Sequence, residues 1–312
     1  MLNVRKVVLS LGMLGLLVSG GTAEAAWPER PVTIISHSAP GAVNDLLTRQ
    51  VAAMLTEELG QPFLVVNQPG GGGNLAVNAV LQARKDGYTL GSSGNHPFGY
   101  NMFTMKVRYK LEDLVPISLI NTSCMAIIAH PDSGWKSMKD ACDAARAEKR
   151  PLKVGIMDNL SRDILLKVAK QEGVQLAPVP QNGGMPCLSA VLGKHVDVSL
   201  LGSIAVDNAK AGKVTILASA SSRRFAEVPD VPTLREQGYD AAFDSFTLLF
   251  GAAGIPDEVV EKLGRAMEKI GATQPYAKML ETLAVEAAPM GSEAARKVVT
   301  TENENMRKLV GK

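Results

Sequence analysis

Aromatic residues are scarce in this 312-residue sequence, at 4%, and neither sign of charge predominates. It has 33 basic and 31 acidic residues, which leaves a formal net charge of +2 at pH 7. Such a balance provides no extended basic field to hold nucleic acid or an acidic membrane surface. Few rings are available for stacking on bases. Both scarcities argue against a nucleic-acid-binding function.

Cysteine is also scarce, and the three cysteines have no metal-binding spacing. Two interpretations of Cys124, Cys142 and Cys187 stay open. Cys124 and Cys142 can form a disulfide if the helix that carries Cys142 packs on the strand that carries Cys124. Alternatively, all three are small buried apolar residues. Neither interpretation implies a metal site.

Catalytic motifs are missing. There is no G-x-S-x-G segment, so a hydrolase would lack the usual setting of its nucleophile. The four histidines have no H-x-x-x-H or H-E-x-x-H spacing, which argues against metal binding. His37 and His96 follow equivalent strands and can face one cleft, and a hydrolase that uses either as its base is kept as an alternative. His130 and His195 are expected to be surface or structural residues.

Long apolar runs are confined to the beginning of the chain. Arg5 and Lys6 precede an apolar run over 7–18, and the small-residue pattern Ala23-Glu24-Ala25 follows it. This order predicts a cleaved signal peptide over residues 1–25, with an uncleaved amphipathic anchor as the alternative. No cysteine near the cleavage point could carry a lipid anchor. We therefore expect a periplasmic protein.

Hydrophobic periodicity predicts alternating strands and helices from Trp27 onward. The first unit has expected strands at 32–35, 63–66 and 88–90, and Asn44 and Asn74 are expected to cap the helices between them. Gly60 is expected to end the first of these helices. Strand–helix–strand alternation of this kind requires a parallel sheet with right-handed crossovers.

A second unit repeats the pattern, and the length suits about two domains. Ser161 is expected to cap its first helix. The strands of this unit are expected at 153–156, 176–179, 196–200 and 214–218. Residues after about 223 are expected to form a helical C-terminal part, with helices at 256–270, after Pro275, and at 293–310.

Three loops at the ends of the first unit's strands are polar and rich in glycine, at 36–45, 67–74 and 91–96. Ligands of open parallel sheets bind outside the carboxyl ends of the strands. Glycine allows the backbone N–H groups to approach a ligand, and the helix N-termini behind them attract anions. These loops therefore predict a site for a carboxylate.

A nucleotide site is a competing interpretation of the second loop, because residues 71–76 fit G-x-G-x-x-A. A dinucleotide site also needs an acidic residue at the end of the next strand, and residues 90–93 contain none. No Lys-Ser or Lys-Thr follows the glycines, which excludes a P-loop. No cofactor is therefore expected, and a flexible turn without a ligand is the remaining alternative.

Together with later motifs, these loops resemble the Bug, or TctC-like, family, the periplasmic solute-binding components of tripartite tricarboxylate transporters. The resemblance covers nearly the whole mature chain. Its motifs are Trp27 to Val32, Ala39-Pro40-Gly41 with Asp45 and Arg49, Asn67 to Asn74, Asp86 to Leu90, Arg224, Val228 to Leu234 with Glu236 and Gly238, and Gly254-Ile255-Pro256.

The resemblance implies an α/β, two-lobed type II periplasmic-binding-protein fold, each lobe a mostly parallel sheet flanked by helices. Residues 27–122 plus 223–312 would form the first lobe, and residues 123–222 the second. It further implies a monomer without enzymatic activity. Such a protein would capture a small organic carboxylate in the interlobe cleft and deliver it to membrane transporter subunits. A ligand-sensing adaptor for a membrane receptor is the alternative.

The ligand contacts that the resemblance implies lie in the three loops. They are Ala39, Gly41, Asp45, Gly72, Gly73, Asn74, Ser92, Ser93 and His96.

The sequence departs from the family's pattern in both lobes. Ser38 replaces an aromatic residue, Ala42 replaces a paired glycine, and Phe246 stands where a tryptophan is common. In the second lobe the loop over 157–163 and the pair at 181–182 are unusual, so Asp158, Arg162 and Asn182 join the candidate ligand contacts.

These second-lobe candidates carry opposite charges. Asp158 would repel a second carboxylate and favour an amine or hydroxyl, whereas Arg162 would pair with a carboxylate. Equally, the two would form a solvated ion pair at a helix start.

Overall fold

The computed structural model describes residues 27–288 and 290–312. The predicted signal peptide, residues 1–25, lies outside the described residues. Within the described ranges, no helix is both long and apolar enough to cross a membrane.

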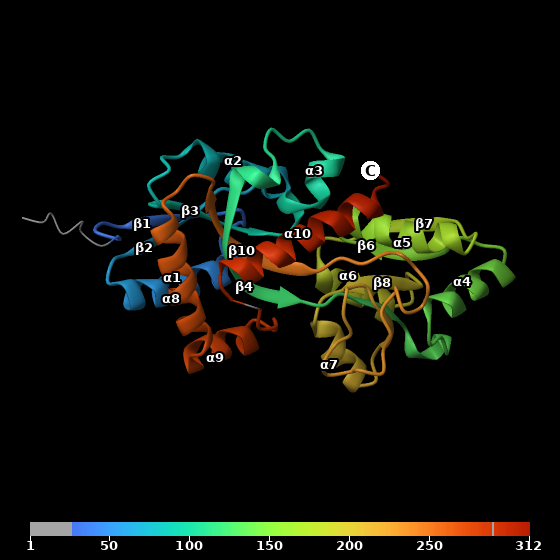
Figure 1. Cartoon of the computed structure of the whole chain (residues 1–312). Helices are drawn as coiled ribbons and strands as arrows, with labels where there is room; N and C mark the ends of the chain where they lie inside the picture. The colour runs from blue at the N-terminus through green and yellow to red at the C-terminus, as the bar shows by residue number, and fades with distance from the viewer. Residues whose placement is uncertain (1–26, 289) are drawn as a thin grey trace, which may run out of the picture.

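Two five-stranded sheets form the centres of two lobes (Figure 1). In sheet order, the first contains β2 (Phe63–Asn67), β1 (Val32–Ser36), β3 (Thr89–Gly94), β10 (Ser245–Ala252) and β4 (Leu114–Ser123). The second contains β7 (Leu176–Pro180), β6 (Leu152–Ile156), β8 (Val198–Leu201), β5 (Ala126–Ala129) and β9 (Thr215–Ser219).

Both sheets are mixed. β1 pairs in parallel with β2 and β3, whereas β10 is antiparallel to β3 and β4. β6 likewise pairs in parallel with β7 and β8, and β5 is antiparallel to β8 and β9. The two-lobed α/β class is confirmed. The expected parallel pairing holds for the strand–helix–strand units, and the later strands add antiparallel pairs.

Helices flank both sheets (Figure 1). Those formed by segments of the first lobe are α1 (Val43–Leu59), α2 (Asn74–Gln82), α3 (Tyr100–Thr104), α8 (Asp257–Gly271) and α9 (Gln274–Thr282). Those of the second are α4 (Met138–Ala147), α5 (Asn159–Gln171), α6 (Gly184–Leu192) and α7 (Ile204–Lys210). Single 3₁₀ turns are η1 (Gly71–Gly73), η2 (His96–Phe98), η3 (Leu111–Asp113) and η4 (Pro131–Ser133). The last helix, α10 (Ser292–Leu309), runs from the first lobe towards α5 of the second.

The expectation of a purely helical C-terminal part is wrong, because β10 lies in the first sheet between β3 and β4. Its sequence, SFTLLFGA, is buried along nearly its whole length. A strand that is covered on both faces is apolar throughout and lacks the alternation that marks a half-exposed strand. β4 and β5 went unpredicted, and they too are largely buried.

Three expected helix caps are also wrong. Ala42 is the N-cap of α1, and Asn44 lies inside the first turn. Gly73 is the N-cap of α2, and Asn74 is the first helical residue. Asp158, and not Ser161, caps α5; Ser161 completes the capping box from the third helical position. Gly60 ends α1 as expected, at a φ of 75° that favours glycine.

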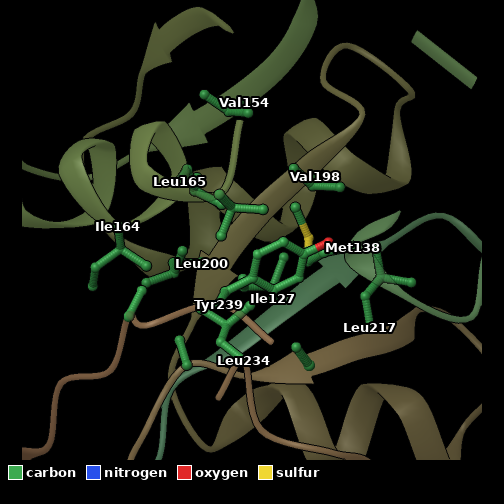
Figure 2. Packing of buried hydrophobic residues seen from close by; sticks show 14 of the residues in the cluster. Ile127, Met138, Val154, Ile164, Leu165, Val198, Leu200, Leu217, Leu234 and Tyr239 are labelled. Atoms are coloured by element: carbon green, nitrogen blue, oxygen red, sulfur yellow. The ribbon is translucent and has the colours of Figure 1, made fainter. Parts of the chain in front are cut away.

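The segment after β9 packs with the second lobe before the chain returns to the first sheet at β10. Leu234 and Tyr239 belong to the same core as Ile127 and Leu200 (Figure 2). Met306 of α10 joins that core as well. The lobes are therefore connected by β4–β5, by the segment before β10, and by α10.

The packing of the three cysteines decides between a Cys124–Cys142 disulfide and buried thiols. Cys124, Cys142 and Cys187 are all buried free thiols. Cys142 and Cys124 belong to different hydrophobic clusters, so no disulfide joins them. Burial raises the pKa of the Cys124 thiol to about 12 and that of Cys142 to about 11. Both behave as small apolar core residues.

Candidate functional site

A cavity of about 510 Å³ lies between the lobes, at the carboxyl ends of β1, β3, β4 and β8. This volume is in the range of small-molecule sites. Its lining comes from both lobes and consists of His37, Val43, Asn44, Gly94, Asn95, His96, Asn121, Ser123, Met125, Gly202, Ser203, Ile204, Ser245, Phe246, Thr247, Leu283, Ala284 and Val285.

The first lobe contributes a compact polar group. Thr247 Oγ1 on β10 donates to Asn44 Oδ1 on α1 at 3.0 Å. A Cβ atom built on Gly94 would lie 3.4 Å from Asn44 Nδ2 and 3.7 Å from the His37 ring, so these groups are neighbours. Side chains from three separate chain segments thus meet at one end of the cavity.

His37 is held by the end of β3, because its backbone N–H donates to the Ser92 carbonyl at 3.1 Å. Burial lowers the pKa of His37, a hydrogen bond to the Ser92 backbone raises it, and the charge of His96 lowers it further. The net pKa is below the ordinary value, so His37 is neutral at pH 7 in the ligand-free protein. A neutral imidazole can donate one hydrogen bond without a fixed positive charge.

His96 connects the two lobes. Its Nε2 lies 3.3 Å from Asp158 Oδ2, at the start of α5 in the second lobe. Burial by itself would raise the pKa of Asp158, but the hydrogen bond and charge of His96, with hydrogen bonds from Ser161, hold it below the usual range. Asp158 is therefore ionised at neutral pH, and its carboxylate can accept a hydrogen bond from the His96 ring.

A second contact joins the two lobes beside the His96–Asp158 pair. Tyr100 Oη on α3 donates to Asp163 Oδ2 on α5 at 2.7 Å. Arg162 also pairs with Asp163, through Nε at 2.9 Å and a terminal nitrogen at 2.8 Å. Arg162 thus pairs with its sequence neighbour, and the alternative Asp158–Arg162 pair is not formed.

Asp45 holds the first loop, residues 36–45, in place through the hydrogen bonds of its carboxylate. Its carboxylate accepts hydrogen bonds from Gly41 N at 2.8 Å, Asn67 Nδ2 at 2.6 Å and Arg49 Nε at 3.1 Å. Burial would raise the pKa of Asp45, yet these donors lower it overall. Both carboxylate oxygens are occupied by donors of the protein, so Asp45 shapes the loop and does not line the cavity.

The second loop packs on the third. Asn74 Oδ1 accepts hydrogen bonds from Tyr109 Oη at 2.7 Å and Asn101 Nδ2 at 3.2 Å. Gly73 has a φ of +97°, and a Cβ there would lie 2.7 Å from Pro97 and 3.0 Å from Ser93 Oγ. Glycine is required here by the close approach of another loop.

Of the predicted ligand contacts, His96 lines this cavity, together with His37, which was expected to face the same cleft. The structure places the others outside the lining: Ala39, Gly41, Asp45, Gly72, Gly73, Asn74, Ser92, Ser93, Asp158, Arg162 and Asn182. Ser92 is fully buried, with its hydroxyl 2.7 Å from Thr48 Oγ1. Asn182 is exposed at the surface. The other two histidines lie elsewhere: His130 caps η4 and His195 is exposed.

Several lining residues were missed by the sequence analysis. Asn121 and Ser123 lie at the end of β4, and Thr247 lies on β10, and the sequence analysis predicts neither strand. Ser203 follows β8, a predicted strand, so the strand-end rule applied to the second lobe would have found it. The segment 283–285 carries no motif that could have signalled its role.

Comparisons with known proteins identify the family. Residues 47–312 match the model of the TctC family, described as the tripartite tricarboxylate transporter family receptor. The protein BugT of Bordetella pertussis is 32% identical over 244 residues, which cover 73% of this chain and 74% of BugT. Both matches span well over half of the chain.

Solved structures agree with this assignment. A TctC solute-binding protein from Polaromonas superposes with a TM-score of 0.80 at 25% identity, covering 92% of this chain and 99% of that one. MatC from Rhodopseudomonas palustris, with bound malate, superposes with a TM-score of 0.71 at 26% identity, covering 91% and 100%. Proteins of this family are periplasmic solute-binding receptors and not enzymes, as the sequence predicted. The chain belongs to the TctC family and is a solute-binding protein.

Proposed function

We propose that this protein captures a small organic carboxylate in the interlobe cavity and delivers it to a tripartite tricarboxylate-type membrane transporter from the periplasm. The observation that carries the proposal is the pair of histidines at strand ends, in a cavity lined by both lobes. Imidazole, amide and hydroxyl donors suit a carboxylate without fixing it through a permanent ion pair. The malate bound to MatC, a relative at 26% identity, supports the same class of ligand.

Capture is proposed to use hinge closure of the lobes. The lining residues of the second lobe, Met125 and the segment 202–204, face those of the first across the gap. A ligand that touches both sets stabilises the closed arrangement, in which the His96–Asp158 contact is made. The closed form is then the species that a transporter would recognise.

Ligand binding can be tested by the shift in melting temperature of ligand-free protein with a panel of small carboxylates. Binding of a ligand to the native state alone raises the melting temperature. We expect His96→Ala to abolish most of the shift and His195→Ala, on the exposed surface, to preserve it. If no carboxylate in a broad panel shifts the wild-type protein, the proposed function is wrong.

Delivery can be tested by uptake of the labelled ligand in cells that lack this protein. We expect the wild-type gene to restore uptake and His96→Ala to restore little at matched periplasmic amounts. Recovery of the protein from the periplasmic fraction, with its N-terminus at Ala26, would support the predicted signal peptide. Normal uptake in cells without the protein, but a lost response to the ligand, would favour the sensing adaptor instead.

A further inference from the structure

Asn44 presents an unused donor group to the interlobe cavity. Its side-chain oxygen accepts a hydrogen bond from Thr247 Oγ1 at 3.0 Å. Its Nδ2 donates to no described residue, although Asn44 lines the cavity and is only partly buried. Polar groups in the wall of a binding cavity that no protein atom satisfies are the usual contacts of a ligand. The side-chain amide of Asn44 therefore offers its N–H groups to the molecule that occupies the cavity.

Thr247 sets the orientation of this amide. Thr247 lies on β10, is 1% exposed and is paired directly with Gly94 of β3 in the first sheet. A threonine side chain held in a strand at this burial has little rotational freedom. Because its hydroxyl engages Asn44 Oδ1, the Nδ2 end of the amide is left to face Gly94 and the cavity.

The missing side chain of Gly94 leaves space in front of two donors. A Cβ atom on Gly94 would lie 3.4 Å from Asn44 Nδ2 and 3.7 Å from His37 Nε2. Both nitrogens belong to residues that line the cavity, one on α1 and one at the end of β1. A carboxylate in this space can direct one oxygen to each nitrogen.

The charges around this space favour an acceptor group. Among the described residues, no lysine, arginine, aspartate or glutamate lines the cavity, so no fixed charge competes for it. An amide N–H group and an imidazole stabilise a carboxylate by hydrogen bonding. An ammonium group would meet donors on both sides and find no negative partner in the lining.

We propose, as a refinement that rests on the carboxylate-binding function proposed above, that the space over Gly94 holds the carboxylate of the ligand. Asn44 is then a ligand-binding residue, and Thr247 is a positioning residue that holds the Asn44 amide. Gly94 is needed because a side chain at this position would fill the space that the carboxylate occupies.

Substitution of Gly94 tests this space directly. Alanine is compatible with the fold, because the φ of Gly94 is not positive and an added Cβ would meet no atom closer than 3.4 Å. We expect Gly94→Ala to weaken carboxylate binding about 100-fold, the effect of two net hydrogen bonds, with the melting temperature unchanged in the absence of ligand. Gly264→Ala, whose added Cβ on α8 would lie 3.8 Å from its nearest neighbour and away from the cavity lining, should bind as wild type.

Variants of Asn44 test the donor. Calorimetry should show about tenfold weaker binding for Asn44→Ala, the effect of one net hydrogen bond. Asn44→Asp should weaken binding further, because an aspartate directs a negative charge at the carboxylate. Asn182→Asp, which makes the same change at the exposed surface, should leave the dissociation constant as in wild type.

Two substitutions of Thr247 separate positioning from packing. Thr247→Val keeps the shape of the side chain and removes the hydroxyl, so the melting temperature should change little while binding weakens about 3- to 10-fold. Thr247→Ser keeps the hydroxyl and removes a buried methyl group, so it should lower the melting temperature and bind near the wild-type level. A purely structural role of Thr247 would give the opposite order of affinities.

The probe in these measurements is the carboxylate that raises the melting temperature of the wild-type protein most, from a broad panel that includes malate, succinate, adipate and benzoate. Wild-type affinity in a folded Gly94→Ala variant, or equal affinities of Thr247→Val and Thr247→Ser, overturns the assignment of the carboxylate to this space and leaves carboxylate capture intact. Absence of a response of the wild-type protein to the whole panel overturns both.

Discussion

At the residue scale, the titration of His37 couples binding to pH. Burial and the charge of His96 keep the pKa of His37 below the ordinary value. A hydrogen bond to the Ser92 backbone has the opposite effect but is smaller than that of burial. A bound carboxylate favours the protonated imidazole, so it raises the pKa of His37, and proton uptake accompanies binding. Affinity should therefore increase as pH falls from about 8 towards the low pKa of the free protein, by at most about tenfold per pH unit for one proton.

The measurement is the dissociation constant of one carboxylate ligand, determined by calorimetry between about pH 5.5 and 8, a range that includes the ordinary His pKa. His37→Asn should flatten the part of the pH dependence that His37 causes, since its amide does not titrate. His195→Asn, at the exposed surface, should leave the dependence as in wild type. A wild-type affinity that is constant over this range would contradict the role of His37.

At the element scale, α10 carries a buried carboxyl group that touches the site indirectly. Glu302 is 1% exposed and accepts hydrogen bonds from Asp244 N at 2.9 Å and Asn95 Nδ2 at 3.2 Å. Burial is the main cause that raises the pKa of Glu302 well above that of an unfolded glutamate, and the charge of Asp244 adds to it. The hydrogen bonds of Glu302 lower its pKa, but by less. The folded chain therefore keeps this proton at pH values where the unfolded chain has lost it.

This difference makes stability depend on pH. Above a pH of about 4.5 the unfolded state releases the proton and the native state retains it, so the contribution of Glu302 to the free energy of unfolding decreases as pH rises through its folded-state pKa. Glu302→Gln keeps a neutral acceptor for Asp244 N and should reduce the loss of stability between about pH 5 and 7. Urea denaturation at several pH values measures this. Glu293→Gln, exposed on the same helix, should retain the wild-type dependence.

The elements also show how far the sequence could be interpreted. Strands β1, β2 and β3 were predicted because β-branched runs alternate with amphipathic helices that end in glycine or begin with a polar residue. β10 was missed because both of its faces are covered, which removes the period-two signal.

The strand-end rule correctly brought His37 and His96 to one cavity. It could not show that Gly73 packs closely against Pro97 or that Asn74 accepts a hydrogen bond from Tyr109, because such contacts depend on how distant loops pack.

At the scale of the whole molecule, the two lobes are coupled by a few polar contacts, and these should control affinity separately from stability. The Tyr100–Asp163 hydrogen bond, at 2.7 Å, joins α3 of one lobe to α5 of the other. Its loss in Tyr100→Phe should weaken ligand binding about 3- to 10-fold, the effect of one net hydrogen bond on the closed state. Tyr239→Phe is the matched control, because it removes a 2.8 Å hydrogen bond to Glu172 within the second lobe.

The two tyrosine variants are expected to separate closure from folding. Tyr239→Phe should lower the melting temperature while the dissociation constant stays near wild type, because the Tyr239–Glu172 bond lies within the second lobe and does not cross to the first. In Tyr100→Phe the ligand should also produce a smaller decrease in the radius of gyration measured by X-ray scattering, since the closed state is less populated. If Tyr100→Phe binds as tightly as wild type and contracts fully, the contact is not part of closure. Binding energy in this fold would then come from the cavity lining alone.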